Sequence, residues 1–322
     1  MIKIIKSNKF ISLLLLIMCI IIIINPSSYA KSCLNGVSVW ALKVFPLMFP
    51  FFILTKMIAS LNTPKENFMD KFFNKVYYAP NGSFSTFFLS TLSGYPMGAK
   101  LIAQMHENKQ INSTEAKKML SFCSVSGPMF MIGTVGVAML SSFKAGVIIL
   151  ISNMVASLLN GFIHRGKKQI KKELKLTNNN QSISFSDCVH DSLISVLMVG
   201  AYIVVSFIFI DLLRNLHITS FISNAICNLF KCESNFNVVQ SVLNGIIEIT
   251  RGIFDLSNST LSLQTKTIIS SGLIGFGGVS ILLQSVSFLN KIKVPIKSMI
   301  IQKTTQGIIC LIISFILCIL FL

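Results

Sequence analysis

Two charged residues stand inside an apolar segment, where a charge is costly. Glu248 and Arg251 lie three positions apart within residues 236–256, so that on a helix they share one face. A charged group at membrane depth usually faces a partner or a polar cavity. Arg251 could bind an anionic solute, while Glu248 could accept a hydroxyl group, a proton or a coupling cation. The alternative is an internal ion pair that only fixes the local backbone.

Four polar, glycine-broken interruptions of apolar segments are the second candidate feature. They fall as two pairs, one in each half of the chain: residues 93–98, 126–128, 248–252 and 275–278. Non-helical backbone at membrane depth is tolerated where protein buries it or where it lines a watery cavity. Amides at the ends of half-helices can hold anions, and unwound carbonyl groups can hold sodium. The pattern therefore predicts a solute site near the middle of the membrane, where the interruptions meet.

The candidate binding residues come from these interruptions and their immediate neighbours. Lys100 follows the first interruption and is a second candidate cation, although a lysine can also extend its ammonium group to the membrane surface. Single serines and threonines in membrane helices often bond to their own backbone, so each is weak evidence by itself. The full set is Ser93, Gly94, Tyr95, Gly98, Lys100, Ser126, Gly127, Glu248, Thr250, Arg251, Gly277, Gly278 and Gln284.

The composition indicates a polytopic membrane protein. Of 322 residues, 52% are hydrophobic and only 12% are charged, which is too apolar for a soluble domain of this size. The net charge of +17 sits in short connectors between apolar runs, where it sets topology rather than binding nucleic acid. We expect the lipid bilayer and a small solute as partners. The residues do not decide between a monomer and a homo-oligomer.

Metal and enzyme chemistry have little support. The eight cysteines are scattered without a CxxC pair or a histidine at ligand spacing, so no metal site and no cofactor are expected. The sequence Gly278-Val279-Ser280 resembles the serine motif of rhomboid-type proteases, but its one plausible histidine partner, His190, lies near a helix end. The chain has no HExxH motif and no phosphate-binding loop, so we expect that it is not an enzyme.

The chain divides into two similar halves after an N-terminal segment. Residues 1–32 form either a signal-like segment or a retained transmembrane anchor, which we favour. Residues 33–175 form a first repeat, 176–188 a linker and 189–322 a second repeat. Each repeat is predicted as a crossing helix, an interfacial helix, a re-entrant hairpin, a broken helix and a second crossing helix.

The basic connectors decide the orientation of the halves. Cytoplasmic loops collect lysine and arginine, and the connectors on both sides of residues 83–105 are basic. Both can face the cytoplasm if residues 83–105 form a re-entrant hairpin. The prediction is an all-α membrane protein with inverted-topology repeats. The alternative is an ordinary bundle of about nine or ten crossings with packing glycines.

Five stretches resemble the YlbJ family of sporulation integral membrane proteins, within the wider group that carries the nucleoside-recognition or gate domain. They are FPLMFPFFI (45–53), SGYPMGAKL (93–101), FCSVSGPMFMIGTVG (122–136), IEITRGI (247–253) and GFGGVSILLQ (275–284). The resemblance implies a fold similar to concentrative nucleoside transporters, in which re-entrant hairpins meet unwound helices. It also implies an endospore-forming bacterium, and a location in the cell membrane or the outer forespore membrane.

The leading hypothesis is a transporter of a small anionic solute. The family is associated with moving dipicolinic acid, an aromatic dicarboxylate, toward the forespore, and an anion suits Arg251 and Lys100. Coupling to Na⁺ or H⁺ stays open. The alternatives are a nucleoside transporter and a non-transporting membrane scaffold needed for spore assembly.

Overall fold

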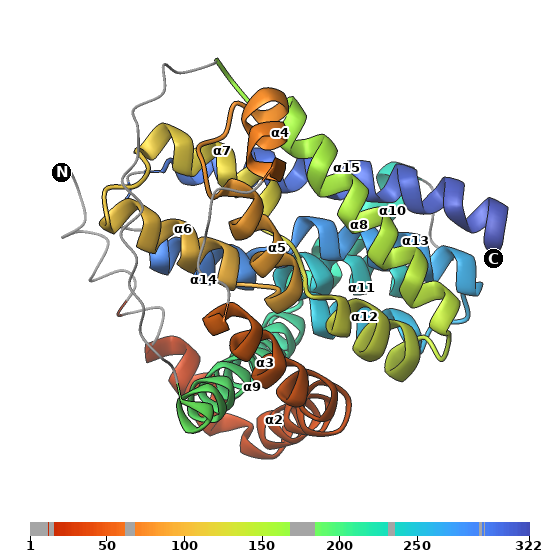
Figure 1. Ribbon diagram of the computed structural model, residues 1–322. Coiled ribbons are helices and arrows are strands. Elements are labelled where there is room, and N and C mark those ends of the chain that lie inside the picture. Colours follow the sequence, from red (N-terminus) through yellow and green to blue (C-terminus); the bar gives the residue numbers. More distant parts are fainter. Residues whose placement is uncertain are drawn as a thin grey trace.

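Every regular element in the described part of the chain is a helix (Figure 1). The computed structural model describes residues 12, 16–61, 68–167, 184–230, 236–289, 292 and 294–322. The elements within these ranges are α2 (Pro26–Val39), η1 (Trp40–Val44), α3 (Phe45–Leu61), α4 (Phe68–Tyr77), α5 (Ser83–Ser93), α6 (Met97–Glu107), α7 (Ser113–Cys123), η2 (Met129–Met139), α8 (Phe143–Ile163), α9 (Phe185–Asn215), α10 (Ile218–Phe230), α11 (Phe236–Ile247), α12 (Ile249–Ser257), α13 (Leu263–Phe276), α14 (Gly278–Leu289) and α15 (Ile296–Phe321). The prediction of an all-α protein is confirmed.

Five helical stretches of the described residues are long and apolar enough to cross a bilayer, which takes about 20 residues. They are Pro26–Ile58, Phe143–Ile163, Phe185–Asn215, Leu263–Leu289 and Ile296–Phe321. The prediction of a polytopic membrane protein is confirmed.

The predicted segment boundaries fall differently at two places. Among the described residues, the first helix long enough to cross the membrane begins at Pro26, inside the predicted N-terminal segment, and proline is favoured in a first helical turn. Residues 1–11 and 13–15, which include the N-terminal lysines and the start of the apolar run, lie outside the described residues. Helix α9 begins at Phe185, within the predicted linker 176–188, of which residues 176–183 also lie outside the described ranges.

A π-helical turn joins α2 to α3. The amide of Phe45 donates to the carbonyl of Trp40, five residues back, directly before Pro46. A proline has no amide hydrogen and crowds the carbonyl four residues earlier, and a wider turn ahead of it accommodates that crowding. The indole Nε1 of Trp40 donates to the carbonyl of Val196 at 3.1 Å. This bond fixes the stretch against α9, beside which α2 and α3 lie (Figure 1).

Two pairs of short helices do not fit separate crossings. Helices α5 and α6 have 11 residues each, α11 has 12 and α12 has 9. At about 1.5 Å per residue each is at most about 18 Å long, against a hydrocarbon core of about 30 Å. The members of each pair pack against each other. Each pair therefore has the dimensions of a hairpin that enters half of the membrane.

The buried core is shared by both halves of the chain. One hydrophobic cluster contains Val135 of η2, Phe207 of α9 and Ile253 of α12. A second cluster contains Ile102 of α6 and Phe122 of α7, with side chains of α14 and α15 packed around them. Because each cluster draws on elements before and after residue 176, the interruptions of the two halves are brought close together.

Asn112 holds the start of α7, the helix that leads to the second interruption. Its side chain accepts hydrogen bonds from the amides of Thr114 and Glu115, both at 2.9 Å, and the Glu115 carboxylate accepts from the Asn112 amide at 2.9 Å. We expect Asn112→Ala to lower the free energy of unfolding by about 1 kcal/mol, because these amides lose their acceptor. Unfolding in detergent measures it. Asn112→Ser should keep most of the stability, and equal losses in both variants would contradict the capping role.

Candidate functional site

Each predicted interruption separates two helices. The first is the turn between α5 and α6, the second is the non-helical stretch 124–127 between α7 and η2, the third is Glu248 between α11 and α12, and the fourth is Gly277 between α13 and α14. The sequence located these breaks because glycine and proline mark them locally.

The glycines of the first and second interruptions pack backbone against backbone. Gly94 has φ 72° and ψ −167°, a conformation that is essentially limited to glycine. A Cβ atom on Gly94 would lie 2.5 Å from the amide nitrogen of Gly127, and one on Gly98 would overlap the carbonyl of Cys123. Gly94, Gly98 and Gly127 thus allow the two breaks to approach each other closely.

Tyr95 connects the first interruption to the fourth. Its hydroxyl donates to the carbonyl of Ile274, in the last turn of α13, at 3.3 Å. Gly277 has a left-handed φ of 86°, and a Cβ added there would lie 3.5 Å from the Tyr95 hydroxyl. Gly278 is also left-handed, with φ 73°. The two glycines therefore shape the break against which Tyr95 rests.

A cavity of about 240 Å³ opens beside the first interruption, between α3, α9 and α14. Ser93 and Gln284, two of the predicted binding residues, contribute polar groups to its wall. Four aromatic side chains and two lysines also line it, namely Phe52, Tyr95, Tyr202, Phe288, Lys56 and Lys100. Aromatic walls with a few charged groups are typical of small-molecule sites.

The charge of this cavity is positive. The ammonium group of Lys56 lies 3.6 Å from the carboxylate of Asp191 and donates to Ser195 at 3.3 Å. Asp191 is 60% exposed, so it neutralises Lys56 only in part. Within the described residues, no carboxylate lies within 4 Å of the Lys100 ammonium group. A lysine without a partner beside a partly paired lysine favours an anion.

A second, smaller cavity of about 50 Å³ adjoins the first and shares Tyr95, Tyr202 and Gln284 with it. Its polar lining comes from three other interruptions or their neighbours: Ser126, Gly127, Glu248, Thr250 and Ser280. The two cavities together thus bring residues of three predicted interruptions, and neighbours of the fourth, to one region.

Glu248 occupies the amino terminus of α12. Its carboxylate accepts the amide hydrogen of Arg251 at 2.7 Å, and the residue is 5% exposed. A carboxylate at a helix N-terminus satisfies amides that would otherwise be available to an anionic ligand. The N-terminus of α12 is therefore already capped by a carboxyl group of the protein itself.

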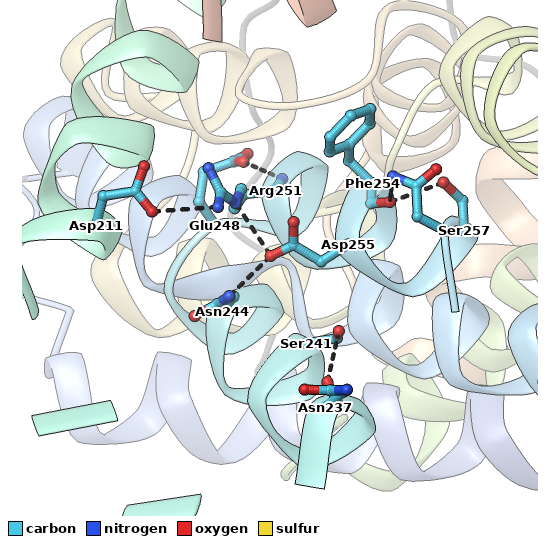
Figure 2. A network of polar contacts seen from close by, with 10 residues as sticks. Asp211, Asn237, Ser241, Asn244, Glu248, Arg251, Phe254, Asp255 and Ser257 are labelled. Atoms are coloured by element: carbon cyan, nitrogen blue, oxygen red, sulfur yellow. Dashed lines mark hydrogen bonds and ion pairs between the residues drawn. The ribbon is translucent and has the colours of Figure 1, made fainter. Parts of the chain in front are cut away.

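Arg251 belongs to an ion-pair network and lines neither cavity (Figure 2). Its guanidinium group lies 3.2 Å from Asp211 and 3.0 Å from Asp255, and it stacks over the ring of Phe207 at 4.6 Å. Asn244 donates to the same Asp255 carboxylate at 2.8 Å. The ion pairs of Arg251 are therefore with Asp211 and Asp255, whereas its hydrogen bond with Glu248 comes from the backbone amide. The binding of the solute by Arg251 stays a prediction.

Asp211 and Arg214 lie three positions apart on α9, a spacing that permits an ion pair along the helix. The Asp211 carboxylate instead binds Arg251 on the packed helix α12. Within the described part of the chain, Arg214 makes no ion pair within 4 Å. Spacing along one helix does not reveal a partner 40 residues away.

Sequence reasoning missed three residues of this region. Lys56 and Tyr202 lie in apolar segments away from the four predicted interruptions. Lys303 lies in α15 and is only 5% exposed. It donates to the Tyr95 hydroxyl at 2.6 Å and to the Gln306 amide oxygen at 3.0 Å. The available signal was a lysine and a glutamine at i, i+3 within the final apolar segment.

Comparison with known proteins gives one relative. The chain is 26% identical, over 315 aligned positions, to the sporulation integral membrane protein YlbJ of Bacillus subtilis (strain 168). The match covers 89% of this chain and 77% of that protein. No protein-family model matches the chain, and no solved structure matches it.

Proposed function

The chain is a homologue of a sporulation integral membrane protein, and from this premise we propose that it is a transporter of a small anionic solute, dipicolinic acid, during endospore formation. The proposal places the solute in the two adjoining cavities at the helix interruptions. It assigns the protein no catalytic chemistry.

The order of elements supports inverted-topology repeats. The first half runs α2–α3, α4, the pair α5 and α6, the broken pair α7 and η2, and α8. The second half repeats this succession with α9, α10, the pair α11 and α12, the broken pair α13 and α14, and α15. The short pairs act as re-entrant hairpins, and the broken helices present irregular backbone to them. Binding sites of transporters with inverted repeats lie at such a junction.

The observation that carries the proposal is the positive, aromatic-walled cavity. A planar dicarboxylate needs a cationic or amide donor for each carboxylate, and Lys56 and Lys100 supply two ammonium groups to one cavity. Its ring would stack against aromatic side chains such as Tyr95 and Phe288. A nucleoside carries no carboxylate, so it would not form ion pairs with the ammonium groups of Lys56 and Lys100.

Uptake by proteoliposomes tests the proposal. We expect saturable uptake of radiolabelled dipicolinate, compared with uridine and with empty vesicles. Lys100→Gln should weaken dipicolinate binding about 10- to 100-fold, as expected when one hydrogen bond to a charged group is lost. Lys144→Gln is the matched control, since Lys144 is an exposed lysine at the start of α8 and lines neither cavity.

Other outcomes select the alternatives. Saturable uridine uptake without dipicolinate uptake would move the substrate class to nucleosides. No uptake of either compound by folded protein would favour a membrane scaffold for spore assembly, with the glycines serving helix packing.

A further inference from the structure

The side chain of Lys303 places an ammonium group inside the helical bundle without a carboxylate beside it. The residue is 5% exposed. Within the part of the chain that the structure describes, no acidic group lies within 4 Å of it. A buried charge is costly unless polar groups replace its hydration shell. Its compensation therefore has to come from neutral oxygen atoms.

Three oxygen atoms from three separate elements accept the three ammonium hydrogens. They are the Tyr95 hydroxyl at the first interruption, the Ser124 carbonyl at the second interruption and the Gln306 amide on α15. The ammonium group also lies 4.5 Å from the centre of the Tyr95 ring, where a cation is attracted to the π face.

The chemistry of these ligands is that of a monovalent-cation site. Ser124 caps the C-terminus of α7, so its carbonyl lies at the negative end of the helix dipole. Its backbone is no longer helical, with φ −89° and ψ 80°. Carbonyl groups of unwound backbone and the C-terminal ends of half-helices are the groups that coordinate Na⁺ inside membrane proteins. The space next to the ammonium group is a cavity of about 10 Å³, about the minimum for one water molecule. It leaves no room for a further hydrated ion.

We propose that Lys303 is a tethered cation: its ammonium group fills a monovalent-cation site formed by Tyr95, Ser124 and Gln306. The intact protein therefore takes no sodium ion at this position. Removal of the side chain opens a site for a small cation from solution. The inference concerns this site alone and does not depend on which solute is transported.

The filled site also fixes the wall of both cavities. Tyr95 accepts a hydrogen bond from Lys303 and donates its own hydroxyl hydrogen to the Ile274 carbonyl. The ring that lines both cavities is thereby held between α15 and the end of α13. Loss of the cation would release this ring.

Thermal unfolding of the purified protein in detergent tests the proposal, with the fluorescence of Trp40 as the signal. We expect Lys303→Ala to lower the melting temperature by about 5 °C or more in choline chloride. Sodium or methylammonium at equal ionic strength should restore at least half of that loss, because each binds only the folded state. Lys303→Met fills a similar volume without a charge, so its melting temperature should be lower than that of the wild type, and added cations should not raise it. Lys297→Ala, an exposed lysine of the same helix, is the control.

Three results would overturn the proposal. One is a Lys303→Met variant as stable as the wild type, which would make the lysine a space-filling residue. Another is a folded Lys303→Ala variant that no small cation stabilises. The third applies even if Lys303→Ala does not fold, because it is measured on the wild-type protein. If sodium stabilises the wild type more than choline does, and if Tyr95→Phe abolishes this difference, the site is open to cations from solution.

Discussion

Arg251→Met is expected to lower the free energy of unfolding by about 3 kcal/mol, the lower end of the range for breaking a buried ion pair. The substitution leaves the carboxylates of Asp211 and Asp255 without the cation that lies 3.2 Å and 3.0 Å from them. Their side chains are 17% and 23% exposed, so water offsets part of the loss. Reversible unfolding in mixed micelles measures the effect.

Two variants sharpen this prediction. Arg214→Met removes a charge from the same end of α9, and it should change stability by no more than about 0.5 kcal/mol. Neutralising the three partners, with Arg251→Met, Asp211→Asn and Asp255→Asn together, should recover much of the stability, because the side chains of residues 211 and 255 then no longer carry charges that have lost their partner. If the Arg251→Met protein has normal stability but does not bind dipicolinate, the result would instead indicate that Arg251 contacts the solute.

Gly94→Ala is expected to cost about 2–6 kcal/mol, as the sum of backbone strain and of overpacking. The φ and ψ of Gly94 lie in a region that other residues avoid, and the added Cβ would press on the backbone of Gly127 rather than on a side chain that can move. Yield of folded protein and its unfolding in detergent measure the effect.

Gly82→Ala is the matched comparison. Gly82 is also left-handed, with φ 80°, but a Cβ there would meet only the terminal methyl group of Met105 at 3.5 Å. It should therefore carry the conformational cost alone, about 1–2 kcal/mol. Equal losses in the two variants would show that the contact between Gly94 and Gly127 does not contribute.

The sequence predicted local features of the fold better than distant contacts. The breaks around Gly94 and Gly277 were visible because glycine marks backbone that a helix cannot accommodate. The short helices beside these breaks are predicted by the same helix-breaking residues. The start at Pro26 of the first membrane-length helix among the described residues was not predicted, because the apolar run before it and the small residues after it also fit a signal-like segment.

The site was predicted in part, and the misses have a common cause. Tyr95, Glu248 and Gln284 lie beside broken backbone, and the structure brings them to adjoining cavities. Lys56 and Lys303 lie in unbroken helices, so their role depends on packing between elements distant in the sequence. Local spacing shows which residues share a helix face, but it does not show what that face meets.

The contact between Gly94 and Gly127 also has a mechanical meaning. Two backbones at van der Waals distance, with no side chain between them, behave as one rigid body, because packed protein transmits displacement instead of absorbing it. The turn between α5 and α6 should therefore travel with the start of η2. The opposite wall of the larger cavity comes from α3 and α9. Trp40, in the π-helical turn that leads into α3, donates to the carbonyl of Val196 on α9 and so connects these two helices. The volume of the larger cavity therefore depends on the relative position of these two blocks.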